Sequence, residues 1–219
     1  MDYTDKTCKE FVACVGTGEP VPGGGSAAAL AGALGASLGA MVASLTIGKI
    51  KDSEEREVLQ QQIDEILGIQ RELVELVQKD IDGFEPLAKL YRRKAAGPEE
   101  KRKLDEEKQK ALYEACLVPM EIVRKCGRAI ELAEEFVSKG SRIVIADAAS
   151  SAVLLKAAMQ GASFNIYVNA SMLKDKDLAK RINGECTSRI VYYGALAEAV
   201  FGKTTNTLID TVVETDTIF

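Results

Sequence analysis

Apolar residues recur every three or four positions along most of this 219-residue chain, which is the spacing of amphipathic helices. The spacing predicts helices over about residues 3–15, 52–82, 98–139 and 175–201. Each of these segments is long enough to bury one apolar face against its neighbours, so the pattern favours a helical bundle.

Glycine and proline indicate where these helices break. Gly83 and Pro86 should kink or interrupt the second helix before a short helical piece at 87–93. Pro119 should kink the third helix, because proline lacks the backbone N–H that a helix interior uses. To the Thr-rich residues 202–219 we assign no regular structure beyond an extension that a partner could stabilise.

One segment is apolar on every face. Residues 26–48 contain no charge, and Ser26 is expected to be the N-cap of a helix there. One face carries a ridge of larger side chains: Leu30, Leu34, Leu38, Met41 and Leu45. Another face carries small residues: Ala28, Gly32, Gly35, Gly39 and Ala43. Such a helix is buried on all sides, at the centre of a bundle or in a bundle completed by another subunit. Its length also suits a membrane span, but Ala and Gly dominate, so we favour a core helix and expect no membrane partner.

Residues 141–171 are less regular in pattern. Residues 143–145 are compatible with a short strand, whereas the Ala-rich run that follows favours a helix from about Ile145. Residues 163–171 are expected to be extended or irregular. The chain has no internal repeat and no low-complexity linker. We therefore expect one domain over residues 1–219, all-α, an orthogonal or antiparallel bundle of five to seven helices.

Composition narrows the possible functions. Aromatic residues make up 5% of the chain and Trp is absent, which favours helices over a β-sandwich. The net charge of −5 argues against a nucleic-acid partner held by bulk positive charge. The chain has no histidine, which excludes Ser-His-Asp triads, His-ligated zinc and histidine bases. Any catalysis must use carboxylates, Lys, Cys, Tyr, Ser, amides or backbone dipoles.

The five cysteines suggest a reducing compartment. Their number is odd and no CxxC occurs, so we interpret them as reduced, mostly buried thiols of a cytoplasmic protein. A catalytic thiolate is the alternative, and without histidine it would need Lys, Arg or a helix N-terminus. The first ten residues carry three acidic side chains and no apolar core, so they do not resemble a signal peptide.

The strongest local motif is the run Pro22, Gly23, Gly24, Gly25 and Ser26. Proline fixes φ and glycine permits positive φ, so the run predicts a rigid, unusual path that opens into a helix N-terminus. Free N–H groups at that end can hold an anion or a polar heterocycle. The alternative is a tight turn that only lets the helix enter the core.

Five further polar residues are candidates for chemistry, each with a structural alternative. Lys49 follows the uncharged helix and either complements its dipole or binds an anion. Asp80 lies near the predicted kink and is either solvated or functional. Asp147 lies among apolar residues as either a helix cap or a functional carboxylate. Asn165 and Asn169 offer amide contacts, although Asn is also a common turn residue.

These motifs together resemble those of a known family. The run EPVPGGGSAAALAGALGASLGAMVASLTIGK at 19–49 is similar to the signature of the cyclodeaminase/cyclohydrolase family. The segment at 80–84 resembles the family's Asp-Ala-x-Ala-Phe element, and 145–147 and 161–169 resemble its Ser-Asp-Ala and Gly-Ala-x-x-Asn-Val-x-x-Asn elements. The chain departs from the pattern at Ser141, Ala146 and Ser150.

The resemblance implies an all-helical homodimer with its site near the subunit interface, acting on a tetrahydrofolate. Two activities are implied equally. One makes 5,10-methenyltetrahydrofolate from the 5-formimidoyl compound with release of ammonia. The other hydrolyses 5,10-methenyltetrahydrofolate to 10-formyltetrahydrofolate. A folate-binding or scaffold protein of the same fold without catalysis is the remaining alternative.

The resemblance also implies roles for residues. Asp80 and Asp147 would transfer protons, and Lys49 would hold the acidic tail of the folate or tune a carboxylate. The turn from Pro22 to Ser26 would hold the pteridine or the reacting carbon, with amide contacts from Asn165 and Asn169. Such a reaction needs no metal and no redox cofactor.

Overall fold

The chain folds as a bundle of long helices. The computed structural model describes residues 2–139 and 144–215. Within these ranges there is no strand, and the all-α prediction is confirmed. The elements are a 3-10 turn at Tyr3–Asp5 and the helices α1 (Cys8–Val15), α2 (Gly24–Ile47), α3 (Ser53–Arg92), α4 (Pro98–Lys139), α5 (Ile145–Ser171) and α6 (Lys176–Thr215).

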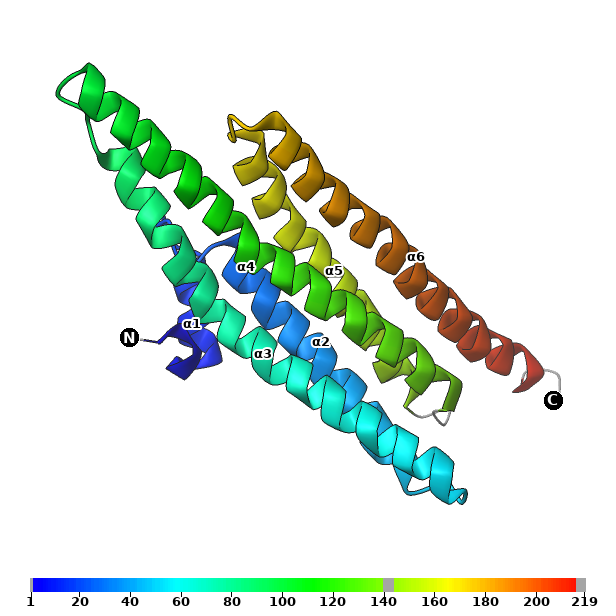
Figure 1. The fold of residues 1–219 in the computed structure, drawn as a ribbon. Coiled ribbons are helices and arrows are strands. Elements are labelled where there is room, and N and C mark those ends of the chain that lie inside the picture. Colours follow the sequence, from blue (N-terminus) through cyan, green and yellow to red (C-terminus); the bar gives the residue numbers. More distant parts are fainter. Residues whose placement is uncertain (1, 140–143, 216–219) are drawn as a thin grey trace.

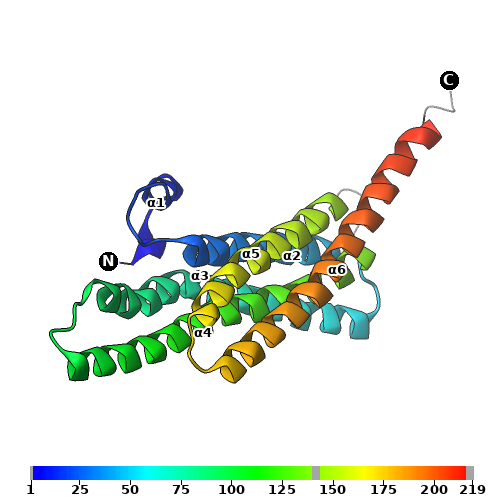
Figure 2. The same cartoon turned by 90° about the horizontal axis from the view of Figure 1, so that it is seen from above.

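Consecutive long helices run in opposite directions (Figure 1). The helices α3 and α4 form one hairpin, α2 packs on α3 and α5, and α6 packs on α5 and α4. Seen from above, α2 and α5 lie on one side of the α3–α4 hairpin, and α1 lies beyond the N-terminal end of α2 (Figure 2). The main apolar core includes residues from each of the helices α1 to α6, and a smaller cluster around Leu87 and Leu112 lies apart from it.

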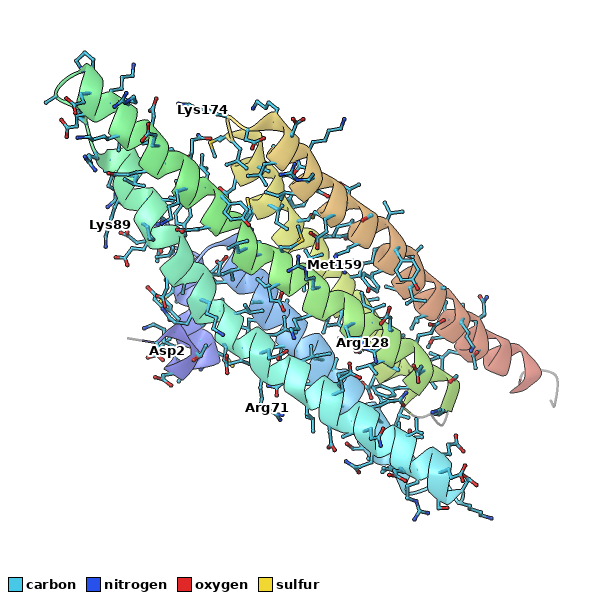
Figure 3. The ribbon with its side chains drawn as sticks, in the orientation of Figure 1. Asp2, Arg71, Lys89, Arg128, Met159 and Lys174 are labelled. Carbon is cyan, nitrogen blue, oxygen red and sulfur yellow. The ribbon has the colours of Figure 1, made fainter. Side chains whose placement is uncertain are left out.

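The helix ends and the hairpin use conventional polar contacts. Thr7 and Glu10 form a reciprocal capping box at the start of α1, and Asp52 accepts a hydrogen bond from the backbone N–H of Glu55. Arg128 of α4 forms an ion pair with Glu65 of α3 at 2.7 Å, and a second one within α4 with Glu131 at 2.8 Å. Charged side chains such as Arg71, Lys89 and Arg128 project from this hairpin (Figure 3).

Small residues allow α2 and α5 to approach each other closely. The Ser151 hydroxyl donates to the carbonyl oxygen of Gly35 at 2.7 Å. A Cβ on Gly35 would lie 2.8 Å from Cγ of Leu155 and 3.1 Å from its backbone N. The predicted small-residue face of α2 is buried, but its larger ridge is not: Leu34 is 56% and Leu45 is 52% exposed. Within one chain, α2 is therefore enclosed on one side only.

We expect Gly35→Ala to lower the free energy of unfolding by about 1–3 kcal/mol, because the new methyl group meets backbone atoms that cannot move aside. Urea denaturation at a fixed protein concentration measures this change. The matched control is Gly184→Ala on α6, where a Cβ meets nothing within 4 Å and should stabilise the helix by about 0.5–1 kcal/mol. Unchanged stability in Gly35→Ala would mean that α2 and α5 are less closely packed than described.

Several predicted boundaries were wrong. Helix α3 is not interrupted at Gly83 or Pro86, because the side chains that follow, such as Leu87, pack on α4. Residues 163–171 are helical rather than extended, since burial against neighbouring helices outweighs the weak helix propensity of their aromatic and β-branched residues. Residues 202–215, to which the pattern assigned no structure, continue α6. Of the possible strand, Val144 is the N-cap of α5, Ile145 is its first residue, and position 143 lies outside the described residues.

Among the described residues, α2 is the one helix long and apolar enough to cross a membrane by length and composition. Half of its most apolar window is buried inside the protein, against α3, α4 and α5. The core helix of a globular domain has the same properties, so length and hydropathy alone give little support to a span.

Candidate active site

The glycine-rich run forms the N-terminus of α2. Gly23 is the N-cap and Ser26 is the third helical residue, so the prediction of Ser26 as N-cap was wrong. None of the described glycines has a positive φ. The freedom of glycine to adopt positive φ is therefore not used in this turn, and the small size of glycine is the property that matters here.

The Asp80 carboxyl group occupies the space beside Gly25 that a larger residue would fill. The Ser26 hydroxyl donates to Oδ2 of Asp80 at 2.7 Å, joining α2 to α3. A Cβ on Gly25 would lie 2.2 Å from Oδ1 of Asp80, well inside the contact limit. Only glycine at position 25 lets the Asp80 carboxyl group lie directly against the first turn of α2.

Burial and hydrogen bonding act on Asp80 in opposite directions. Desolvation by burial raises the pKa of this carboxyl group, and hydrogen bonds from the Ser26 side chain and backbone partly offset the increase. The net pKa is above that of an ordinary aspartate. A partly buried carboxyl group with a raised pKa is suited to accept and return a proton.

A cavity of about 270 Å³ opens beside Asp80. The α2 N-terminus, α3, α4 and α5 each contribute to its wall: Pro20, Val21, Gly23, Gly24, Gly25, Asp80, Gly83, Phe84, Glu114, Ala115, Val118, Pro119, Phe164, Asn165, Val168 and Asn169. Asn165 and Asn169 are four residues apart on α5 and so lie on one face of the helix. Asn169 is 7% exposed, and its Nδ2 donates to the carbonyl oxygen of Ala115 at 3.1 Å.

The ionisable side chains of this wall are both carboxylates. Asp80 comes from α3 and Glu114 from α4, and none of the described residues that line the cavity is Lys or Arg. The glycines of the α2 N-terminus line the same cavity, and the Ser26 backbone and hydroxyl groups donate to the Asp80 carboxyl group. The cavity thus suits a cationic or electron-poor ring that also presents N–H donors.

Comparison with known proteins assigns the chain to a family. The family model described as formiminotransferase-cyclodeaminase matches residues 7–188, which includes every wall residue of the cavity. This chain belongs to the formiminotransferase-cyclodeaminase family. The earlier resemblance is therefore confirmed.

Individual relatives show how far the likeness extends. The methenyltetrahydrofolate cyclohydrolase of Methylorubrum extorquens is 34% identical over 197 residues, covering 90% of this chain and 95% of that protein. The formimidoyltransferase-cyclodeaminase of Gallus gallus is 30% identical, with 76% of this chain matching 31% of that longer protein. The crystal structure of formiminotetrahydrofolate cyclodeaminase from Thermotoga maritima has the same fold, with a TM-score of 0.77, 24% identity, and coverage of 95% of this chain and 98% of that one.

Most residues that the family resemblance singled out lie together. Gly23, Gly24 and Gly25 line the cavity with Asp80, Asn165 and Asn169. Pro22 and Ser26 do not line it: both are buried, Pro22 follows a cis peptide bond in the turn, and Ser26 holds Asp80.

Lys49 and Asp147 lie elsewhere. Helices α2 and α5 are antiparallel, with Gly35 beside Leu155 and Gly24 beside Asn165. Asp147, in the first turn of α5, is therefore about 27 Å along the helix from Asn165, and Lys49 follows the C-terminus of α2 at the same end of the molecule. In one chain neither residue reaches the cavity, and their proposed roles in the reaction stay predictions.

Three wall residues with aromatic or charged side chains were not among the sequence candidates. Phe84 is four residues after Asp80 on α3, so helical spacing could have found it. Phe164, 67% exposed, precedes Asn165 and was hidden by the wrong prediction of an irregular segment. Glu114 lies in an ordinary amphipathic stretch of α4 and gave no local signal.

Among the described residues, the buried thiols are poor candidates for a catalytic thiolate, and no cluster of metal-ligating side chains is found. Desolvation raises the pKa of the Cys116 thiol to about 11 and of Cys126 to about 12, so neither forms a thiolate readily. No three His, Cys, Asp or Glu side chains of the described residues come together as a metal site. The expectation of a reaction without metal or cofactor stays a prediction.

Proposed function

We propose that this protein is a one-carbon tetrahydrofolate enzyme that hydrolyses 5,10-methenyltetrahydrofolate to 10-formyltetrahydrofolate in the cavity beside Asp80. The observation that carries the proposal is a cavity whose ionisable side chains are carboxylates, since the methenyl ring is a cation. The relative from Methylorubrum extorquens, matched along nearly its whole length and called a cyclohydrolase, supports the choice of hydrolysis.

The proposed mechanism uses one carboxylate as a proton shuttle. Water adds to the carbon between N5 and N10, and the Asp80 carboxylate removes a proton from the water as the new C–O bond forms. The tetrahedral carbon then expels N5, which receives that proton from Asp80. The remaining hydroxyl proton passes to solvent as the formyl C=O forms on N10, so one proton is released per turnover.

Cyclodeamination is the second candidate, and the full-length match to the cyclodeaminase fold of Thermotoga maritima favours it. In that reaction N10 attacks the amidine carbon of 5-formimidoyltetrahydrofolate, and ammonia leaves with a proton. The substrate amidinium is again a cation and the reacting carbon again becomes tetrahedral. The same cavity and the same Asp80 therefore suit either reaction.

Two assays on the purified chain separate the candidates. Loss of methenyltetrahydrofolate absorbance above the buffer rate supports hydrolysis, and ammonia release from 5-formimidoyltetrahydrofolate supports cyclodeamination. Calorimetry with 5-formyltetrahydrofolate, a stable analogue, completes the test. Binding without turnover in both assays would favour a non-catalytic folate-binding protein, and neither binding nor turnover by folded protein would refute the proposal.

We also propose that the protein works as a homodimer through the uncharged face of α2 and α5. The exposed side chains of α2 include Leu34, Met41 and Leu45, and α2 contains no charged residue. On α5 the exposed side chains include Val153, Phe164 and Val168, and the last two also line the cavity. A second copy would cover this apolar surface and complete the burial of α2.

Light scattering tests the dimer. The wild type should have twice the mass of the chain, and Leu34→Asp should be monomeric, whereas Val12→Asp, at an exposed position on α1, should leave the mass unchanged. A monomeric wild type with full activity would refute this part of the proposal.

Subunit mixing tests whether Asp147 acts across such an interface. If the partner copy supplies Asp147, inactive Asp80→Asn and Asp147→Asn proteins should regain activity when their subunits are exchanged. A lack of recovery, or a fully active Asp147→Asn protein, would remove Asp147 from the reaction.

A further inference from the structure

Glu114 is the second carboxylate of the cavity, and the proposed proton transfers do not use it. It lies on α4 next to Ala115, whose carbonyl oxygen binds Asn169. Its side chain is 50% exposed, so it stands at the mouth of the cavity, whereas Asp80 lies against the first turn of α2.

The register of α3 against α4 separates the two carboxylates by a definite amount. A Cβ on Gly83 would lie 3.8 Å from Val118, which fixes the point where the two helices face each other. Asp80 lies three residues before Gly83 and Glu114 lies four residues before Val118, and the helices are antiparallel. The two positions are therefore seven residues apart, about 10 Å along the hairpin at 1.5 Å per residue.

A pterin ring has the matching arrangement of polar groups. Its reacting nitrogen N5 lies on one edge of a rigid bicyclic system, and its N3–H and 2-amino donors lie together on the opposite edge. A carboxylate accepts two such parallel N–H donors at once, and a charged acceptor strengthens both hydrogen bonds. When the reacting carbon lies at Asp80, the donor edge of the ring points away from Asp80 and toward Glu114.

We propose that Glu114 binds the pyrimidine edge of the pterin and so sets the orientation in which the reacting carbon meets Asp80. This inference rests on the proposed folate function. It makes Glu114 a substrate-positioning and specificity residue.

Two of the other polar wall residues already have hydrogen-bond partners: Asp80 accepts from Ser26, and Asn169 donates to the Ala115 carbonyl. Asn165 lies at the α2 end of the cavity, with its Nδ2 3.7 Å from the Cβ position of Gly24. Among the described residues, the one ion pair of Glu114 is with Lys110. The Lys110 Nζ to Glu114 Oε1 distance is long, 3.8 Å, and both side chains are exposed. Such a pair contributes little, so the carboxylate is available to a ligand.

The test is Glu114→Gln, which keeps the size of the side chain and removes its charge. We expect KM for 5,10-methenyltetrahydrofolate to rise about tenfold, with kcat within about twofold of the wild type. Glu106→Gln is the matched control, because Glu106 is also on α4, also exposed, and paired with Arg102 at 4.0 Å. It should leave KM and kcat unchanged.

A substrate analogue tests the contact itself. In calorimetry, the wild type should bind 2-desamino-2-methyl-5-formyltetrahydrofolate about tenfold more weakly than 5-formyltetrahydrofolate, and Glu114→Gln should bind the two equally. Equal discrimination by wild type and variant would overturn the inference, as would an unchanged KM. A wild type that neither binds nor converts any reduced folate would instead refute the proposed function, so the two failures are distinguishable.

Discussion

Asp80→Asn is expected to lower turnover of 5,10-methenyltetrahydrofolate by about 10²–10⁴-fold, the usual effect of removing a general base. Asparagine keeps the shape of the side chain and can still accept the 2.7 Å hydrogen bond from Ser26, so the fold should be retained. What it loses is the ability to take a proton from water and return it to N5. Rates of absorbance loss, corrected for the buffer reaction, measure the effect.

The pH profile gives this variant a second signature. Burial raises the pKa of Asp80, and the base form predominates only above that pKa. In the wild type kcat/KM should therefore fall as the pH drops through a value higher than that of an ordinary aspartate. The same acid limb should be missing from the residual activity of Asp80→Asn.

Asp82→Asn is the control, because Asp82 is exposed two residues further along α3 and accepts from Gln78. It should keep the wild-type rate and pH profile. If Asp80→Asn is as active as Asp82→Asn, the proton shuttle lies elsewhere.

Gly25→Ala is expected to lower kcat/KM by about a hundredfold or more, although it adds a single methyl group. The methyl carbon would lie 2.2 Å from Oδ1 and 2.6 Å from Cγ of Asp80, so the carboxyl group must rotate or move out of its place. The hydrogen bond from Ser26 to Oδ2 cannot be kept in the same geometry. The result should be a folded protein with a displaced base.

The control for Gly25→Ala is Gly18→Ala in the preceding loop, where a Cβ meets nothing within 4 Å. Far-ultraviolet circular dichroism should be unchanged for both variants, and only Gly25→Ala should lose activity. A fully active Gly25→Ala would show that contact between Asp80 and the α2 N-terminus is not needed for the reaction.

The sequence was sufficient for the main features of the fold. Helical periodicity located α1, α3, α4 and most of α6, and the uncharged run located α2. Where it failed, tertiary packing outweighed local propensity: Pro86 stays inside α3, and the aromatic stretch around Phe164 stays inside α5.

The sequence predicted those residues of the candidate site that belong to local motifs, and missed those whose place depends on tertiary packing. The glycine run, Asp80 and Asn165 belong to motifs that can be read locally, and the structure brings them to one cavity. Glu114 was invisible because its position depends on the register of α3 against α4. Asp147 has an equally strong local motif but lies at the far end of α5.

The most direct test is a structure of the protein with 5-formyltetrahydrofolate bound. We expect the pterin in the cavity between α2, α3, α4 and α5, with its one-carbon group within hydrogen-bonding distance of Asp80. A pterin bound instead at the opposite end of α2 and α5, beside Lys49 and Asp147 of the same chain, would contradict this expectation.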